Sequence, residues 1–383
     1  MTNRLALIAI SIILAACAAA PAPREPSPES DVARAFAQGR GQETWAYNAY
    51  WMGDAWRAYD LGAFKRLLFF DIAVAKDGSV DSRGWPDQWA TLRARALDSR
   101  VPIDPVFSIL SVEVFSGVFG SDAARARLLS EILTLSRDAD GVHLDVEVME
   151  GVREQDLSAY RTFLADLRRA LDSPRKRLLT AFVPARNILY GAPELAMLDA
   201  IVAQGYDVHW QSSPVAGPPA SLEGESPAAW RNVAASLTAL GASPRKVLFS
   251  TPFYGYEWPT VSAEPRAATR GAATIITYAP VSAKLLPDLR VNALSRSAQH
   301  GLRRDPATNA PWYAFRDRQG WRQGWFDDPV SLAPRLDFVQ RGDYRGVAIF
   351  VLGYDGGAML DLIQRTFRAG SAPASGGGQP AIR

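Results

Sequence analysis

Short apolar runs that alternate with longer amphipathic segments restrict the fold of this chain more than any other feature. Eight such runs occur between about Trp45 and Gln364, a pattern typical of repeated strand–helix units that build a parallel sheet. The predicted strands are Tyr47–Trp51, Arg66–Ala73, Pro102–Leu110, Gly141–Val148, Leu178–Val183, Ala200–His209, Lys246–Phe253 and Gly346–Leu352. The clearest predicted helices are Ser121–Leu135 and Glu154–Leu171. We therefore predict an α/β fold, a closed (β/α)8 TIM barrel with functional residues at the strand C-terminal ends.

Length and composition are consistent with one large globular domain. The 383 residues are 48% hydrophobic, which is ample for a folded core. The stretch between Trp258 and Arg345 is too long for one connecting helix, so we expect a small α+β insertion at about residues 259–325, between strands seven and eight.

A formal net charge of +2 without a basic stripe argues against a nucleic-acid partner. His209 and His300 have no partners at metal-ligand spacing, so no metal or other cofactor is predicted, and we expect a monomer.

The N-terminus has the pattern of an export signal. An apolar run of about 12 residues ends at Ala16, too short to cross roughly 30 Å of hydrocarbon but typical of a signal peptide. It leads into Leu14-Ala15-Ala16-Cys17, which resembles the lipobox of bacterial lipoproteins, and Cys17 is the only cysteine of the chain. The resemblance implies that residues 1–16 are removed, that Cys17 is lipidated and that the protein is held at a membrane. Because Ala18 is not aspartate, the outer membrane is the expected location. The alternative is an ordinary cleaved signal with a chance cysteine.

Two segments outside the predicted barrel cannot contribute to a core. Residues 17–40 are rich in Pro and small side chains and are expected to form a semi-rigid tether. Residues 371–383 have the same character and are expected to be a disordered tail. The predicted barrel domain therefore covers residues 41–370.

The predicted strand Gly141–Val148 is unusually polar on one face. Because side chains alternate in a strand, its apolar face is formed by Val142, Leu144, Val146 and Val148. The other face, formed by Gly141, His143, Asp145 and Glu147, is expected to point into the barrel. Two carboxylates two residues apart raise one pKa, which leaves a general acid near neutrality. A structural network in the lumen, or an edge strand with a solvated acidic face, is the alternative explanation.

This segment resembles a catalytic signature. Asp140 to Glu147 resembles the Asp-Gly-x-Asp-x-Asp-x-Glu pattern of glycoside hydrolase family 18, the chitinase-like family, with His143 where the family has aspartate. The resemblance implies that Glu147, Asp145, His143 and Asp140 are catalytic. Glu147 would protonate the glycosidic oxygen, and Asp145 would orient the substrate's acetamido group as it attacks C1. The reaction would retain the anomeric configuration without an enzyme nucleophile, an exception to the usual two-carboxylate scheme.

Further blocks resemble the same family in the same order. They are Gln204–Asp207, Pro252–Trp258, Trp325–Leu332 and Gly346–Phe350. By resemblance, Tyr206 and Asp207 would contact the N-acetyl group of the sugar in the cleavage subsite, and Tyr254 would bind substrate nearby. Phe350 occupies the position of the tryptophan that, in the family, forms the floor of this subsite.

The remaining expectations concern His143 and isolated aromatic residues. A neutral imidazole would hydrogen-bond Asp145, whereas a protonated one would lower the pKa of Asp145 and make activity sensitive to pH between about 5 and 8. Trp51 and Trp210, like Trp258, fall at predicted strand ends where sugar rings can stack, although core packing explains any single aromatic equally well.

The leading hypothesis is hydrolysis of β-1,4-linked N-acetylglucosamine polymers such as chitin. An endo-β-N-acetylglucosaminidase and a peptidoglycan-cleaving enzyme would use the same acetamido chemistry, and a chitinase-like lectin would bind amino sugars without cutting them. A non-catalytic periplasmic scaffold is a further alternative. Retention of both Asp145 and Glu147 favours the enzyme over the lectin.

Overall fold

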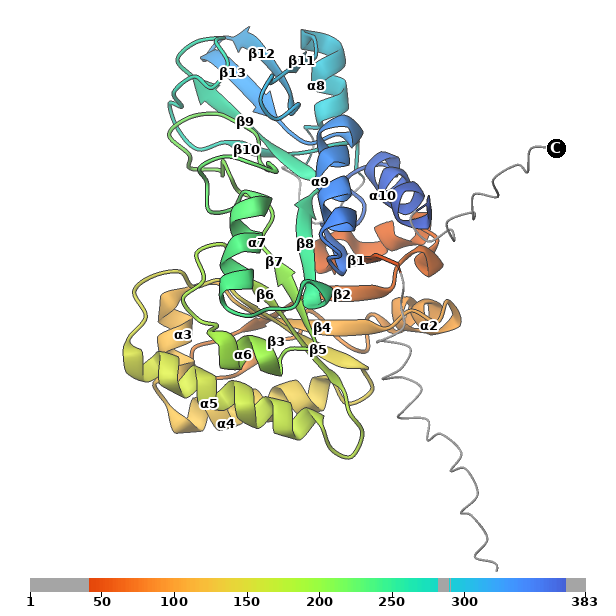
Figure 1. Ribbon diagram of the computed structural model, residues 1–383, viewed down its shortest axis with the longest axis vertical. Helices are drawn as coiled ribbons and strands as arrows, with labels where there is room; N and C mark the ends of the chain where they lie inside the picture. The colour runs from red at the N-terminus through yellow and green to blue at the C-terminus, as the bar shows by residue number, and fades with distance from the viewer. Residues whose placement is uncertain (1–40, 282–288, 290, 370–383) are drawn as a thin grey trace, which may run out of the picture. The chain divides into compact units, whose positions relative to one another are not determined.

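The predicted barrel is present in the computed structural model, which describes residues 41–281, 289 and 291–369. These residues belong to one compact unit, Arg40–Arg383. Eight parallel strands pair around a closed ring, since the first strand bonds to both the second and the last (Figure 1). In ring order they are β1 (Glu43–Ala49), β2 (Arg66–Val74), β4 (Ile103–Ile109), β5 (Gly141–Val146), β6 (Leu178–Val183), β7 (Ala200–Ala203), β8 (Val247–Pro252) and β14 (Gly346–Phe350). The two-residue strand β3 (Val80–Asp81) pairs antiparallel with β2.

Helices follow most strands and cover the outside of the barrel. They are α2 (Ala90–Asp98), α3 (Val112–Phe119), α4 (Asp122–Leu135), α5 (Glu154–Leu171), α6 (Ala192–Met197), α7 (Trp230–Ala239), α9 (Pro329–Arg341) and α10 (Ala358–Ala369). Side-chain caps define some of their starts: the Ser121 hydroxyl accepts the N–H of Ala124 at α4, and Asp328 accepts two N–H groups at α9. None of the described helices is long and apolar enough to cross a membrane.

The expected insertion separates β8 from β14. It comprises β9 (Tyr254–Thr260), β10 (Thr274–Thr277), α8 (Ala293–His300), β11 (Arg303–Arg304), β12 (Pro311–Asp317) and β13 (Gly320–Trp325). Its strands form an antiparallel sheet in the order β10-β9-β13-β12-β11, which lies at the top of Figure 1 with α8 beside it. Since β9 begins two residues after β8 ends, the insertion rises directly from a strand C-terminal end.

Most predicted strands differ from the structure by one or two residues at an end, and two of them differ more. The first strand ends at Ala49, and the following residues form 3-10 turns, η1 (Tyr50–Ala58), kinked at Gly53 where φ is 52°. The sixth barrel strand, β7, ends at Ala203 rather than at His209. In both places buried residues continue past the strand, among them Met52 and Tyr206, and burial alone does not distinguish such a loop from a strand. Two further 3-10 turns are η2 (Leu61–Ala63) and η3 (Pro244–Lys246).

A charged cluster fills the lumen at the strand N-terminal ends. The Trp45 ring lies between the guanidinium groups of Arg66 and Arg345, 5.5 and 5.3 Å from the ring centroid. Arg66 forms a buried ion pair with Asp104, and Arg345 pairs with Glu43 at 3.0 Å. Each cation therefore has a carboxylate partner, as burial requires. This end of the barrel is packed, which leaves the opposite end for a ligand.

Candidate active site

Glu147 and Asp145 lie at the C-terminal end of β5, where a barrel carries its catalytic groups. Asp145 is buried, with 3% of its surface exposed, whereas Glu147 follows the strand and is partly exposed. The backbone N–H of Glu147 donates to the carbonyl of Ile109 on the neighbouring strand (2.9 Å), so the sheet geometry continues through this residue. The polar face points into the lumen, because His143 contacts Tyr47 of β1 across the barrel.

Glu147 has the electrostatic properties of a general acid. Burial, followed by the negative charge of Asp207, raises the pKa of Glu147 from 4.5 to about 7. At neutral pH a substantial fraction of Glu147 therefore carries a proton, and the same group can accept one after releasing it.

Asp145 offers an unused hydrogen-bond acceptor. Burial raises the pKa of Asp145, and the charges of Glu147 and Asp71 add to the effect. Its Oδ1 atom is buried and has no hydrogen-bond partner in the structure. Leaving such an atom unpaired is unfavourable, so the site is suited to a ligand that supplies an N–H or O–H group there.

His143 does not pair with Asp145, contrary to expectation. Nε2 is hydrogen-bonded to the hydroxyl of Tyr47 (2.9 Å) and Nδ1 to that of Thr180 (2.8 Å). Thr180 donates its own proton to the carbonyl of Val142 (3.3 Å), so it accepts from Nδ1–H, and Nε2 accepts from Tyr47. Burial and the charge of Arg66 lower the pKa of His143 to about 3. The imidazole is therefore neutral between pH 5 and 8, and the pH sensitivity expected from its protonation does not follow.

Asp207, which follows β7, and two tyrosines of β9 form another wall of the site. The Tyr254 and Tyr256 hydroxyls both donate to Oδ1 of Asp207 at 2.8 Å. Burial raises the pKa of Asp207, and these two hydrogen bonds partly oppose the shift. The Tyr206 ring centroid lies 5.9 Å from that of Tyr254. Burial is the largest cause that raises the pKa of Tyr206, and the nearby charges of Glu147 and Asp145 add to it. The predicted residues Tyr206, Asp207 and Tyr254 are therefore brought together around Glu147.

Phe350 completes an aromatic wall at the end of β14. Its ring centroid lies 5.4 Å from that of Tyr47, 5.3 Å from Phe70, 6.0 Å from Tyr206 and 6.2 Å from Tyr254. Phe350 remains partly exposed, so one side of the ring is available to a sugar face.

Asp140 is not part of this site. It precedes β5, at the opposite end of the strand from Glu147, and its side chain is 57% exposed and paired with Arg175 at 3.0 Å. A strand of this length separates its two ends by about 20 Å, so Asp140 cannot reach a sugar at Glu147. The prediction that Asp140 is catalytic is therefore wrong.

Trp210 and Trp258 are not brought to the carboxylates either. Trp210 is 46% exposed, and its backbone N–H and carbonyl form turn hydrogen bonds with Ser213. Trp258 is fully buried in the core. Stacking of a sugar on Trp210 remains a prediction, while core packing accounts for Trp258.

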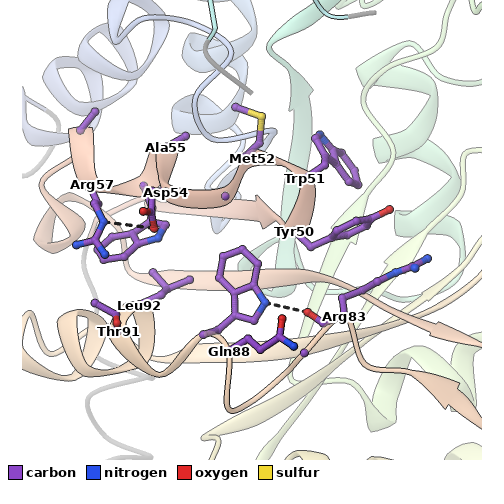
Figure 2. Close-up of a pocket in the computed structure, with 15 residues that line it drawn as sticks. Tyr50, Trp51, Met52, Asp54, Ala55, Arg57, Arg83, Gln88, Thr91 and Leu92 are labelled. Atoms are coloured by element: carbon purple, nitrogen blue, oxygen red, sulfur yellow. Dashed lines mark hydrogen bonds and ion pairs between the residues drawn. The ribbon is translucent and has the colours of Figure 1, made fainter. Parts of the chain in front are cut away.

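Trp51 lines a cavity of about 970 Å³ beside the site. The cavity is bounded by η1 and by the segment that leads into α2, and Figure 2 shows Tyr50 and Trp51 on one side with Arg83 and Gln88 facing them. Trp51 packs edge-on against Phe70 at 5.6 Å, and its Nε1 donates to the hydroxyl of Tyr354 (3.0 Å). Since Phe70 also touches Phe350, the cavity continues the aromatic wall of the site.

Several residues around the carboxylates were not predicted. They are Tyr47, Asp71, Ser108, Thr180 and Tyr256. A signal existed for Asp71, which is a carboxylate inside an otherwise apolar strand, and for Tyr256, which follows Tyr254 at the two-residue period of a strand. Nothing local distinguishes Tyr47 or Thr180 from core residues. Within the described ranges, no three His, Cys, Asp or Glu residues are placed to hold a metal ion.

The class of protein that this barrel and its pair of carboxyl groups on β5 define is the glycoside hydrolases. The chain belongs to the glycosyl hydrolases family 18, whose family model matches residues 110–355, more than half of its length. It is 26% identical over 268 residues to a probable endochitinase of Caenorhabditis elegans, covering 63% of this chain but only 42% of that protein.

Solved structures share the fold. A family 18 chitinase from Cycas revoluta, solved with allosamidin, superposes with a TM-score of 0.70 at 17% identity, covering 85% of this chain and 99% of that one. The spore cortex-lytic enzyme SleL of Bacillus megaterium gives a TM-score of 0.66 at 19% identity, covering 86% of this chain and 75% of the other. At these identities the likeness concerns the fold and not the substrate.

Proposed function

We propose that this enzyme hydrolyses β-1,4 bonds next to N-acetylglucosamine units, with chitin oligosaccharides as the first substrates to test. Glu147 donates its proton to the glycosidic oxygen. The substrate's own acetamido oxygen attacks C1, and Asp145 accepts a hydrogen bond from the acetamido N–H and stabilises the positive charge of the cyclic intermediate. Water then attacks C1 and gives its proton to Glu147, so the product retains the anomeric configuration.

The observation that carries this proposal is the contrast between the two carboxyl groups on β5. Glu147 has a pKa of about 7 and is partly exposed, as a proton donor to a bound substrate requires. Asp145, two residues earlier, is buried and has an acceptor oxygen without a partner. An acetamido N–H is a donor of the right type to occupy that position, and the ring of Phe350 supplies a surface for the sugar.

The proposal is tested with wild type and two matched variants. Glu147→Gln keeps the shape of the side chain but cannot donate the proton, so we expect a loss of kcat of about 10²- to 10⁴-fold with chitooligosaccharides. Glu150→Gln, an exposed glutamate three residues later, is the control and should retain full activity. Nuclear magnetic resonance of the first product reports the anomer, and the β-anomer is expected.

The choice of substrate is decided by the same assay. Glycoprotein glycans and peptidoglycan fragments present the same acetamido group, so they are tested beside chitooligosaccharides. Cleavage of glycoprotein glycans or peptidoglycan in place of chitin would change the substrate that we propose, but not the proposed mechanism. Binding without any product, with Glu147→Gln indistinguishable from wild type, would identify an amino-sugar lectin instead.

We also propose that the protein is an exported monomeric lipoprotein anchored to the outer membrane through Cys17. The signal peptide, Cys17, the tether and the tail lie outside the described residues. The support is the lipobox-like sequence before the only cysteine. Cys17→Ser should move the protein from the outer-membrane fraction to the soluble fraction, and sedimentation of the released protein should give the mass of one chain. An unchanged membrane fraction would refute the anchor.

A further inference from the structure

Asp145 has no carboxylate neighbour at position 143. In the family pattern that position carries an aspartate, but here it carries His143, whose two nitrogens are engaged by Tyr47 and Thr180. Its pKa of about 3 keeps the imidazole neutral, so it places no charge beside Asp145. Besides Glu147, a carboxylate that acts on the ionisation of Asp145 must therefore come from another strand.

Asp71 on β2 occupies such a place. It is 6% exposed, and its Oδ2 accepts a hydrogen bond from the Ser108 hydroxyl at 2.5 Å. Ser108 is the direct register partner of Asp145 in the parallel β4–β5 pair, so both side chains leave the sheet on the same side. Asp71 therefore reaches the lumen near Asp145, because its hydrogen-bond partner Ser108 lies beside Asp145 in the sheet.

The irregular backbone of β2 explains how Asp71 faces inward. Strict alternation would send Phe70 and Asp71 to opposite faces. The β2–β4 register shifts between Phe69 and Ile72, and both residues between them reach the lumen: Phe70 contacts the Tyr47 and Phe350 rings, and Asp71 bonds Ser108. An inward carboxylate in an apolar strand is unfavourable without a role.

We propose that Asp71, on the nearby strand β2, is the positioning carboxylate of Asp145. It replaces the aspartate that the family has at position 143. This inference rests on the proposed function, in which Asp145 holds the substrate's acetamido group. Like charges in a buried site oppose ionising together, and the charge of Asp71 raises the pKa of Asp145. Asp71 therefore sets the pH above which Asp145 is ionised and accepts the acetamido N–H.

Other groups near the pair do not supply this charge. The titratable and charged groups around it are Glu147 after β5, Tyr47 on β1, Tyr190 after β6, Tyr206 after β7, and Arg83 and Asp81 beyond Asp71. Burial raises the pKa of each of the three tyrosines, so they remain neutral. Glu147 is the one other carboxylate acting on Asp145 directly, and it must keep its own proton to act as the acid.

The test is the pH profile of kcat/KM for Asp71→Asn, whose amide oxygen can still accept the Ser108 hydrogen bond. Because a like charge is removed, the pKa of Asp145 should fall and the acidic limb should move down by about 1 pH unit. The basic limb, set by Glu147, should stay in place. A merely structural defect would lower activity at all pH values without moving one limb. Asp98→Asn, which removes an exposed carboxylate at the end of α2, is the control and should leave both limbs unchanged.

A second measurement separates this inference from the proposed function. Titration of the ¹³C-labelled Asp145 carboxyl by nuclear magnetic resonance needs no substrate; it should show a lower pKa in Asp71→Asn than in wild type, and in wild type a second inflection where Asp71 ionises. An unshifted Asp145 titration would overturn the role of Asp71 even if chitooligosaccharides are cleaved. A shifted titration without cleavage of any amino sugar would uphold the pair and refute the hydrolase proposal instead.

Discussion

Replacing Glu147 by glutamine should stabilise the folded protein, and most strongly at neutral to alkaline pH. The pKa of Glu147 is about 7 in the folded chain against 4.5 for a free side chain. Between these values the unfolded state loses a proton that the folded state keeps, so rising pH favours unfolding. The penalty is under about 1 kcal/mol at pH 5 and reaches about 3 kcal/mol at pH 8. Glu147→Gln cannot ionise and escapes this penalty.

The assay is urea unfolding of wild type, Glu147→Gln and Glu150→Gln at pH 5 and pH 8. The gain in unfolding free energy of Glu147→Gln over wild type should be larger at pH 8 than at pH 5 by about 2 kcal/mol. The exposed control should show no such difference between the two pH values. An equal gain at both pH values, or a larger gain at pH 5, would mean that the folded site does not favour the protonated acid, and the assignment of Glu147 as the proton donor at neutral pH would lose its physical basis.

Three further predictions concern the neighbours of the site and the core. Asp207→Asn removes the charge that helps to raise the pKa of Glu147, so the basic limb of kcat/KM should move to lower pH but remain above 4.5, because burial is the larger cause; an upward shift would contradict this. Arg335→Met leaves the buried Asp327 without its ion-pair partner at 2.6 Å, and denaturant unfolding should show a loss of about 3–5 kcal/mol. Gly205→Ala would place a methyl carbon 2.2 Å from a backbone carbonyl oxygen, and thermal unfolding should reveal a destabilisation of about 1–3 kcal/mol.

The local pattern of residues 141–148 was sufficient to predict which side chains face the lumen. The period of two in a strand is a property of the backbone, so it could be read without knowing any neighbour. The same holds for α5, whose boundaries follow from apolar spacing, and for the barrel as a whole, because alternating strands and helices have few ways to close. Asp140 illustrates the limit of a motif: its spacing agreed with the family pattern, but its position at the wrong end of β5 excludes it from the site.

The order and spacing of the apolar residues were therefore enough to predict the barrel, the position of its insertion and the face on which Asp145 and Glu147 stand. The protonation and the partners of those groups could not be predicted before the fold was known. His143 is 96 residues from Tyr47 and 37 from Thr180 along the chain. Asp71 reaches the site because the pairing of β2 is irregular, and local propensities do not predict this irregularity. Such contacts depend on the register of neighbouring strands and on burial in a shared lumen, and both exist only after the ring of strands has closed.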